Sequence, residues 1–364
     1  MSIERDIEDQ FDREVADISK ANLMVVGGTG VGKSSLINRV FGKKLAAVGA
    51  GEPVTRGCQK YESENIPVVI FDTEGYEISE GGDKNNSNFQ KVVIGEIRRR
   101  ENLALQHHIH LYWYCISAAN HRITDYDIEN IKALCQRQAD LAIVITQCDS
   151  EELNNQDEGV TSLELKAALK DAGIKNKVFE TSAILEEKLE LDDLIEWSTE
   201  NLPTDKLKDA FVGAQRSNIE LKDKKADEAI LIAAGLAATA GGVNPIPISD
   251  ALVIAPIQMT LAARLAQIYG FNALGESVVS LLKAQVVNLI GRQIAASLTK
   301  LIPIFGQIIN AATAGALTTG LGYALKHTYR AAYEEALVTG KAPNWSVLFG
   351  NLDVLSFIKN YASK

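Results

Sequence analysis

The stretch Gly27-Gly28-Thr29-Gly30-Val31-Gly32-Lys33-Ser34 decides how the first half of this chain folds. It matches the pattern G-x-x-x-x-G-K-[ST], follows the apolar run at 23–26 and precedes a helical pattern at 34–41. Glycines let backbone N–H groups turn inward around phosphate oxygens, and the N-terminus of the following helix adds partial positive charge. We therefore expect a phosphate-binding loop whose nucleotide-binding residues are Gly28, Thr29, Gly30, Val31, Gly32, Lys33, Ser34 and Ser35.

Two further features supply groups that a bound nucleoside triphosphate needs. Asp72-Thr73-Glu74-Gly75 follows the apolar run at 66–71, so Asp72 is placed to hold Mg²⁺ through water and the Gly75 N–H to meet the γ-phosphate. Thr55 lies between the two motifs, in what we interpret as a loop, and its hydroxyl is expected to meet Mg²⁺ only when a nucleoside triphosphate is bound. The expected cofactor is Mg²⁺, with Ser34, Thr55 and Asp72 as its ligands.

The purine base of the nucleotide is predicted to bind at Thr146-Gln147-Cys148-Asp149, which follows the apolar run at 141–145. The Asp149 carboxylate can accept hydrogen bonds from N1–H and the 2-amino group of guanine. Adenine does not offer these donors, and a polar site of this kind discriminates strongly. Thr181-Ser182-Ala183 lies at the end of the last predicted strand and places the Ala183 N–H near guanine O6. We therefore expect GTP or GDP as ligand, with base contacts from Gln147, Asp149, Ser182 and Ala183.

Apolar runs alternate with helical patterns as far as residue 201. Continuous apolar runs are typical of strands buried on both faces, and their alternation with helices predicts a doubly wound α/β sheet. The predicted strands are 23–26, 66–71, 109–116, 141–145 and 177–181. The predicted helices between them are 34–41, 92–105, 123–138, 161–172 and 191–201.

The character of the chain changes after Pro203. Residues 204–228 are charged and favour one helix, and from residue 229 the chain is apolar, helical in pattern and without strand signals. Residues 229–364 carry nine basic and five acidic side chains, against 28 and 42 in residues 1–228. We therefore divide the chain into an N-terminal amphipathic helix at 1–20, an α/β domain at 21–203, a connecting helix at 204–228 and an apolar α-helical domain at 229–364.

Charge and composition limit the partners. The net charge of −10 and the lack of a basic stripe argue against nucleic acid. The charged N-terminus lacks the apolar segment of a signal peptide and the four cysteines form no C-x-x-C pair, so we expect a cytoplasmic protein with reduced thiols. The uncharged stretch 301–325 leaves three alternatives open: a buried helical hairpin, reversible docking on a membrane, and insertion into it.

With these motifs in this order, the first 200 residues resemble the Ras-like translation-factor class of P-loop GTPases, and most closely its Era-like branch. Thr29-Gly30-Val31-Gly32-Lys33-Ser34-Ser35-Leu36-Ile37-Asn38 is similar to bacterial Era-like GTPases and to vertebrate immunity-related GTPases. Val243-Asn244-Pro245-Ile246-Pro247 and Leu301-Ile302-Pro303-Ile304-Phe305-Gly306 resemble the apolar helical domain attached to a subset of bacterial Era-like GTPases. The resemblance implies a Ras-like G domain, which is a three-layer P-loop sandwich. It also implies a separate all-α domain formed by the N-terminal helix and the C-terminal half.

The same resemblance implies hydrolysis of GTP to GDP and phosphate, slow in the isolated protein, as part of a conformational or assembly switch. Tyr76 stands where Ras-like enzymes carry the glutamine that orients water, and Gly30 stands where potassium-stimulated relatives carry asparagine. The expected catalytic residues are Lys33, Thr55, Arg56 and Glu74. Arg56, or Glu74 or Glu77, of one G domain acting on the nucleotide of a second G domain would replace the missing glutamine.

The family also implies a homodimer in the GTP state and peripheral membrane contact through the helical domain. The alternative is a GTP-dependent binding or assembly module with negligible turnover that needs an activating partner. A ribosome- or RNA-associated role is disfavoured by the acidic charge.

Overall fold

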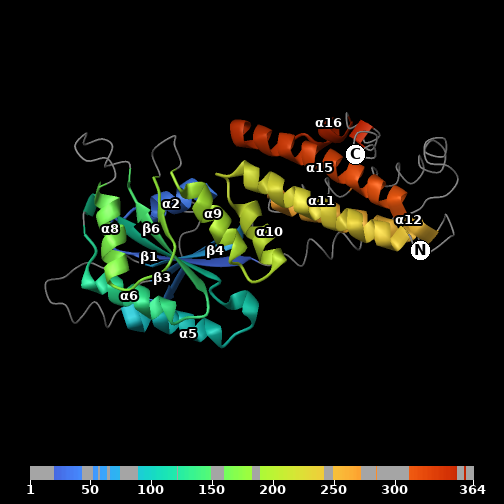
Figure 1. Ribbon diagram of the computed structural model, residues 1–364. Coiled ribbons are helices and arrows are strands. Elements are labelled where there is room, and N and C mark those ends of the chain that lie inside the picture. The colour runs from blue at the N-terminus through green and yellow to red at the C-terminus, as the bar shows by residue number, and fades with distance from the viewer. Residues whose placement is uncertain are drawn as a thin grey trace. The chain divides into compact units, whose positions relative to one another are not determined.

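The computed structural model describes residues 20–42, 52–55, 58–63, 66–73, 89–120, 122–148, 160–182, 189–241, 249–271, 284, 311–350 and 356–357. The chain divides into two compact units, one of Ser19–Asn218 and the other of Ile219–Lys364 together with Met1–Ile18 (Figure 1). The described part of the first unit is α/β, and that of the second is helical. The predicted N-terminal helix at 1–20 lies outside the described residues, apart from Lys20.

A seven-stranded sheet is the centre of the first unit (Figure 1). Its strands are β1 (Ala21–Gly27), β2 (Glu52–Thr55), β3 (Cys58–Ser63), β4 (Ile66–Thr73), β5 (Leu111–Ser117), β6 (Asp140–Thr146) and β7 (Val178–Glu180). They lie in the order β2-β3-β4-β1-β5-β6-β7. β4, β1, β5, β6 and β7 are parallel, whereas β3 runs antiparallel to β2 and β4. The carboxyl ends of the parallel strands therefore meet at one edge of the sheet, which we call the carboxyl edge.

Helices cover both faces of this sheet. On one face, side chains of α5 (Gly95–Glu101), α6 (Asp125–Cys135) and α8 (Val160–Asp171) pack with Tyr112 and Tyr114 of β5. On the other face, Trp113 stacks on Phe41 of α2 (Lys33–Phe41) and donates to Ser198 Oγ of α9 (Leu191–Glu200) at 3.0 Å. Successive strand side chains point to opposite faces, so one apolar run supplies both cores. This three-layer arrangement confirms the predicted α/β class.

The prediction that Thr55 lies in a loop is wrong. Its backbone ends strand β2 and pairs with Cys58 of β3. β2 is the edge strand of the sheet, and Pro53, which has no N–H to donate, is tolerated at such an edge. A short edge strand does not need the continuous apolar run that marks strands buried on both faces, so the sequence pattern misses it.

Residues 204–228 form two helices rather than the predicted single connecting helix. α10 (Asp205–Ala214) ends where Gln215 adopts an extended conformation (φ −72°, ψ 149°). The Gln215 side chain accepts from the Asn218 N–H at 2.8 Å and donates to the Asn218 carbonyl at 2.7 Å. α11 (Ile219–Gly241) then runs through the predicted boundary at residue 229. Local bonds from a side chain to the backbone therefore interrupt a stretch that favours helix throughout.

The second unit packs three long helices together: α11, α12 (Ser249–Ile268) and α15 (Ala311–Thr339), followed by the short α16 (Trp345–Gly350). α11 and α15 approach closely at Gly322, where a Cβ would lie 2.7 Å from Ile230 Cγ1. Lys222 of α11 is fully buried, and its Nζ donates to the Ile268 carbonyl at 3.0 Å. The helical nature of this half is therefore confirmed where the structure describes it.

The apolar stretch 301–325 is described only from residue 311, where α15 begins. Across the described ranges, no helix combines the length and the hydropathy that spanning a membrane requires. Between residues 271 and 311, the structure describes only residue 284.

The four cysteines all lie within the described residues, and none forms a disulfide. Cys58, Cys115 and Cys148 are buried, whereas Cys135 at the end of α6 is exposed. The Cys135 thiol donates to Asn176 Oδ1 at 3.2 Å, and partial burial raises its pKa.

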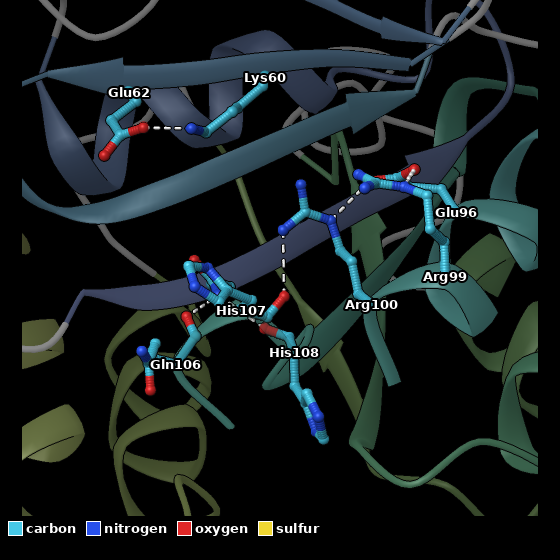
Figure 2. Close-up of polar contacts among 9 residues, drawn as sticks. Lys60, Glu62, Glu96, Arg99, Arg100, Gln106, His107 and His108 are labelled. Atoms are coloured by element: carbon cyan, nitrogen blue, oxygen red, sulfur yellow. Dashed lines mark hydrogen bonds and ion pairs between the residues drawn. The ribbon is translucent and has the colours of Figure 1, made fainter. Parts of the chain in front are cut away.

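A polar cluster lies beside the amino ends of β1 and β5. Asn22 Nδ2 donates to the Gln106 carbonyl at 2.8 Å, within the turn η2 (Leu105–His107). Arg100 of α5 donates from Nη1 to the His107 carbonyl at 3.0 Å and from Nε to Glu96 Oε1 at 2.6 Å (Figure 2). These bonds tie α5 to the turn and the turn to β1.

His110 completes this cluster as a neutral imidazole. Its Nδ1 accepts from the Asn22 N–H at 2.9 Å, so its proton lies on Nε2, which donates to the Leu105 carbonyl at 2.9 Å. Burial lowers the pKa of His110, with a smaller contribution in the same direction from His108. A proton on Nδ1 would face the Asn22 N–H, so the charged ring loses this contact.

We expect the free energy of unfolding of the first unit to fall as the pH drops below about 6.5, the ordinary pKa of histidine. The His110 pKa is lower in the folded state, so its contribution is complete above that value and is lost as the pH falls through the folded pKa. Urea denaturation of wild type and of His110→Gln between about pH 5 and 7.5 measures the contribution of His110 to this pH dependence. Parallel pH profiles for the two proteins would contradict this assignment.

Candidate functional site

The glycine-rich turn joins the carboxyl end of the central strand β1 to the N-terminus of α2. Gly27 has φ +147°, and a Cβ there would lie 2.4 Å from the Cys115 carbonyl oxygen, so only glycine fits. Gly30 and Gly32 have φ +78° and +87°, a region that side chains disfavour. Residues 28–32 therefore turn sharply and deliver the chain into α2 at the carboxyl edge, where doubly wound sheets bind ligands.

Within this turn, the predicted phosphate-binding residues differ in exposure. Thr29, Gly30, Ser34 and Ser35 are exposed, Gly28 and Gly32 are half-buried, and Val31 and Lys33 are buried. The first turn of α2 carries no acidic side chain of its own that would compete with an anion for its N–H groups.

Lys33 and Asp72 carry opposite charges at the same edge. Lys33 Nζ donates to the carbonyl oxygens of Gly27 and Gly28, at 3.0 and 2.9 Å. Burial lowers the pKa of the Lys33 ammonium, and the Asp72 carboxylate opposes this shift. Asp72 lies on β4, beside Val25 of β1. Burial raises the pKa of Asp72 to about 6 against the attraction of Lys33.

The chemistry of these groups fits Mg²⁺. Asp72 Oδ1 is buried without a hydrogen-bond partner among the described residues, which is costly unless a ligand or ion completes it. The Ser34 hydroxyl is exposed in the first turn of α2. Carboxylate and hydroxyl oxygens are the hard donors that Mg²⁺ prefers. Thr55, the third predicted ligand, is described in its backbone only.

Two residues at the end of β6 hold the glycine-rich turn from the side. Thr146 Oγ1 donates to the Val31 carbonyl, and Gln147 Nε2 donates to the Gly30 carbonyl at 3.4 Å. Gln147 Oε1 in turn accepts from Ser117 Oγ at the end of β5. The sequence identifies Gln147 but not the roles of Thr146 and Ser117, because these contacts join residues far apart along the chain.

The ends of β6 and β7 are tied together beside these residues. The Thr181 N–H donates to the Ile145 carbonyl at 2.8 Å, and the Cys148 N–H donates to the Thr181 carbonyl at 3.3 Å. Ser182 is buried next to this contact. The structure thus brings the predicted base-binding segments 146–148 and 181–182 together. Asp149 and Ala183 lie outside the described residues, as do Arg56, Glu74 and Gly75.

Residues 22–170 match the model of a protein family described as 50S ribosome-binding GTPase. This stretch is a P-loop GTPase domain. The match covers the glycine-rich turn, Asp72 and the 146–149 segment, and it relates the domain to GTPases, which are hydrolases.

Three curated proteins are similar to parts of the domain. Human Septin-12 is 27% identical over 35% of this chain and 41% of its own length. Magnetosome membrane protein 22 of Magnetospirillum gryphiswaldense is 31% identical over 27% of this chain and 53% of its own. Ribosome biogenesis GTPase A of Thermotoga maritima is 42% identical over 15% of this chain and 21% of its own. The chain thus spans about half or less of the length of these curated relatives.

Solved structures are similar at lower identity. Era in complex with MgGDPNP and nucleotides 1506–1542 of 16S ribosomal RNA is 17% identical, with a TM-score of 0.34 over 51% of this chain and 58% of that one. A probable GTP-binding protein engB is 19% identical, with a TM-score of 0.31 over 50% of this chain and 98% of that one.

Proposed function

We propose that this P-loop GTPase domain binds GTP and hydrolyses it to GDP and phosphate. The observation that carries the proposal is that the opposite charges of Lys33 and Asp72 lie at the carboxyl edge beside the glycine-rich turn, close enough for each to shift the pKa of the other. The Lys33 ammonium donates to the carbonyl oxygens of Gly27 and Gly28. When a nucleotide binds, a β- or γ-phosphate oxygen would replace these carbonyls as the acceptor. Asp72, Ser34 and Thr55 would hold Mg²⁺, which neutralises charge on the phosphates when bound.

Recognition of the base would come from Asp149, with Gln147 beside it and the Ser182–Ala183 segment opposite. The bonds between the ends of β6 and β7 support this arrangement, because they bring the two segments together. A carboxylate that must accept two N–H bonds selects guanine over adenine.

Hydrolysis would be slow in the isolated chain, because Tyr76 replaces the glutamine that orients water. Our proposal is that two G domains meet in a homodimer and that Arg56, or Glu74 or Glu77, of one subunit acts on the nucleotide of the other. Lys33 and Thr55 would then act together with this group from the second subunit. An arginine supplied in this way contributes ~10³–10⁵ in rate.

The cellular role that we propose is a switch. GTP would order the segments around Thr55 and Gly75 and change what the helical unit contacts. Peripheral contact with a membrane from the cytoplasm is part of this proposal, and the name of the related Magnetosome membrane protein 22 supports it. The alternative is a GTP-dependent binding module with negligible turnover. A nucleic-acid partner is not part of the proposal, given the net charge of −10.

Binding of fluorescent GDP, competed with GTP, GDP and ATP, tests recognition, and phosphate release at increasing protein concentration tests turnover. We expect GTP and GDP to compete, ATP not to compete, and activity per molecule to rise with concentration. Lys33→Ala should lose binding while Lys132→Ala, which removes an exposed lysine of α6, should not. Competition by ATP equal to that by GTP would overturn the proposal. Flat, negligible turnover with intact binding would favour the binding-module alternative.

A further inference from the structure

We propose that Ser117 is a positioning residue for the nucleotide site: it orients the Gln147 amide, which in turn holds the glycine-rich turn at Gly30. The inference deepens the proposed GTP binding and rests on it. Ser117 makes no contact with phosphate or base in this proposal, and it acts only through Gln147.

Ser117 is placed for this role by the sheet. It is the last residue of β5, is fully buried and lies beside Thr146 of β6 in the parallel register. Its Oγ donates to Gln147 Oε1. A primary amide has one acceptor oxygen and one donor nitrogen, so the end that meets Ser117 decides which end meets the turn. The nitrogen therefore faces the Gly30 carbonyl, at 3.4 Å.

The backbone of Gln147 also needs such support. Its φ of +58° lies in the left-handed region, which a residue other than glycine occupies only when its surroundings hold it there. The side-chain stem passes 3.5 Å from where a Cβ on Gly32 would lie, so it packs over the turn. Asp149, the proposed guanine acceptor, follows two residues later. An amide fixed by Ser117 would therefore steady the phosphate-binding turn and the base-binding segment together.

A second tie makes the proposal testable by comparison. Thr146 Oγ1 donates to the Val31 carbonyl and does not depend on Ser117. Loss of the Ser117 hydroxyl should therefore weaken nucleotide binding without abolishing it. For one lost hydrogen bond we expect release of GDP and GTP to quicken about three- to tenfold, with phosphate release at saturating GTP unchanged.

The experiment is a double-mutant cycle on the rate of fluorescent GDP release from the full chain, using Ser117→Ala, Gln147→Ala and the double variant. If Ser117 acts through Gln147, the double variant releases GDP no faster than Gln147→Ala alone. Thr146→Val, measured alone, reports the second tie and should also quicken release, because Thr146 Oγ1 reaches the Val31 carbonyl directly. Multiplying effects of Ser117 and Gln147, or an unchanged release rate in Ser117→Ala, would overturn the inference and leave the proposed function standing.

Hydrogen exchange of nucleotide-free protein gives a readout that does not need a ligand. Amides of residues 30–32 should exchange faster in Ser117→Ala than in wild type, and amides in the interior of β5 should not. Equal exchange at the turn would count against the inference even if the wild-type chain retained no nucleotide. Failure of the wild-type chain to bind guanine nucleotides would overturn the proposed function and this use of Ser117 with it.

Discussion

Asp149→Asn is expected to lose GTP and to gain xanthosine triphosphate. The carboxylate accepts from two donors of guanine, N1–H and the 2-amino group. An asparagine amide offers one acceptor and one donor, which matches N1–H and the 2-oxo group of xanthine. A site built to pair a ligand group rejects the analogue that leaves it unpaired by about 10⁴-fold. Competition of GTP and of xanthosine triphosphate against a fluorescent nucleotide, in wild type and in Asp149→Asn, measures this change of preference.

The control for this swap is Asp171→Asn, which makes the same change at an exposed carboxylate at the end of α8. It should leave the preference for guanine unchanged. If Asp149→Asn binds GTP as tightly as wild type, the base is held by other groups, and the 146–149 segment serves only to brace the turn through Thr146 and Gln147.

Arg100→Ala should destabilise the first unit by about 3 kcal/mol, because breaking a buried ion pair leaves its partner poorly compensated. Arg100 is buried, pairs with Glu96 at 2.6 Å, and places its Cζ 4.1 Å from the ring centre of Phe71. Phe71 is the residue before Asp72 on β4, so the variant also loses the contact that braces this strand from α5. Urea denaturation followed by tryptophan fluorescence measures the loss.

Arg99→Ala is the matched control, since Arg99 pairs with the same Glu96 carboxylate at 2.7 Å from an exposed position (Figure 2). Exposed ion pairs contribute little, so we expect a loss under about 1 kcal/mol. Equal losses in the two variants would mean that charge alone matters and that the contact with Phe71 adds nothing.

The sequence predicts the parts of the site that are local along the chain. The glycine-rich turn, the strand before it and α2 after it all follow from one stretch, and Asp72 is found because it directly follows the apolar run at 66–71. These motifs carry their own geometry, which is why the order of β1, turn and α2 is confirmed.

What the sequence misses depends on contacts between distant segments. Thr146 reaches Val31 across 115 residues, and Ser117 reaches Gln147 only because β5 and β6 end side by side. β2 is missed because an edge strand needs no apolar run, and the break at Gln215 because its side chain competes with the helix. Each is decided by pairing in three dimensions rather than by residue preference.

The uneven exposure of the four cysteines has a practical use. Cys135 alone among them faces solvent, and it ends α6 close to the amino end of β6, opposite to the glycine-rich turn. A maleimide dye would thus attach at a single native site without any engineered cysteine. Because the Cys135 pKa is raised, coupling would proceed better at mildly alkaline pH than at neutrality. A fluorophore there would report tumbling and assembly of the chain from a place remote from the bound nucleotide.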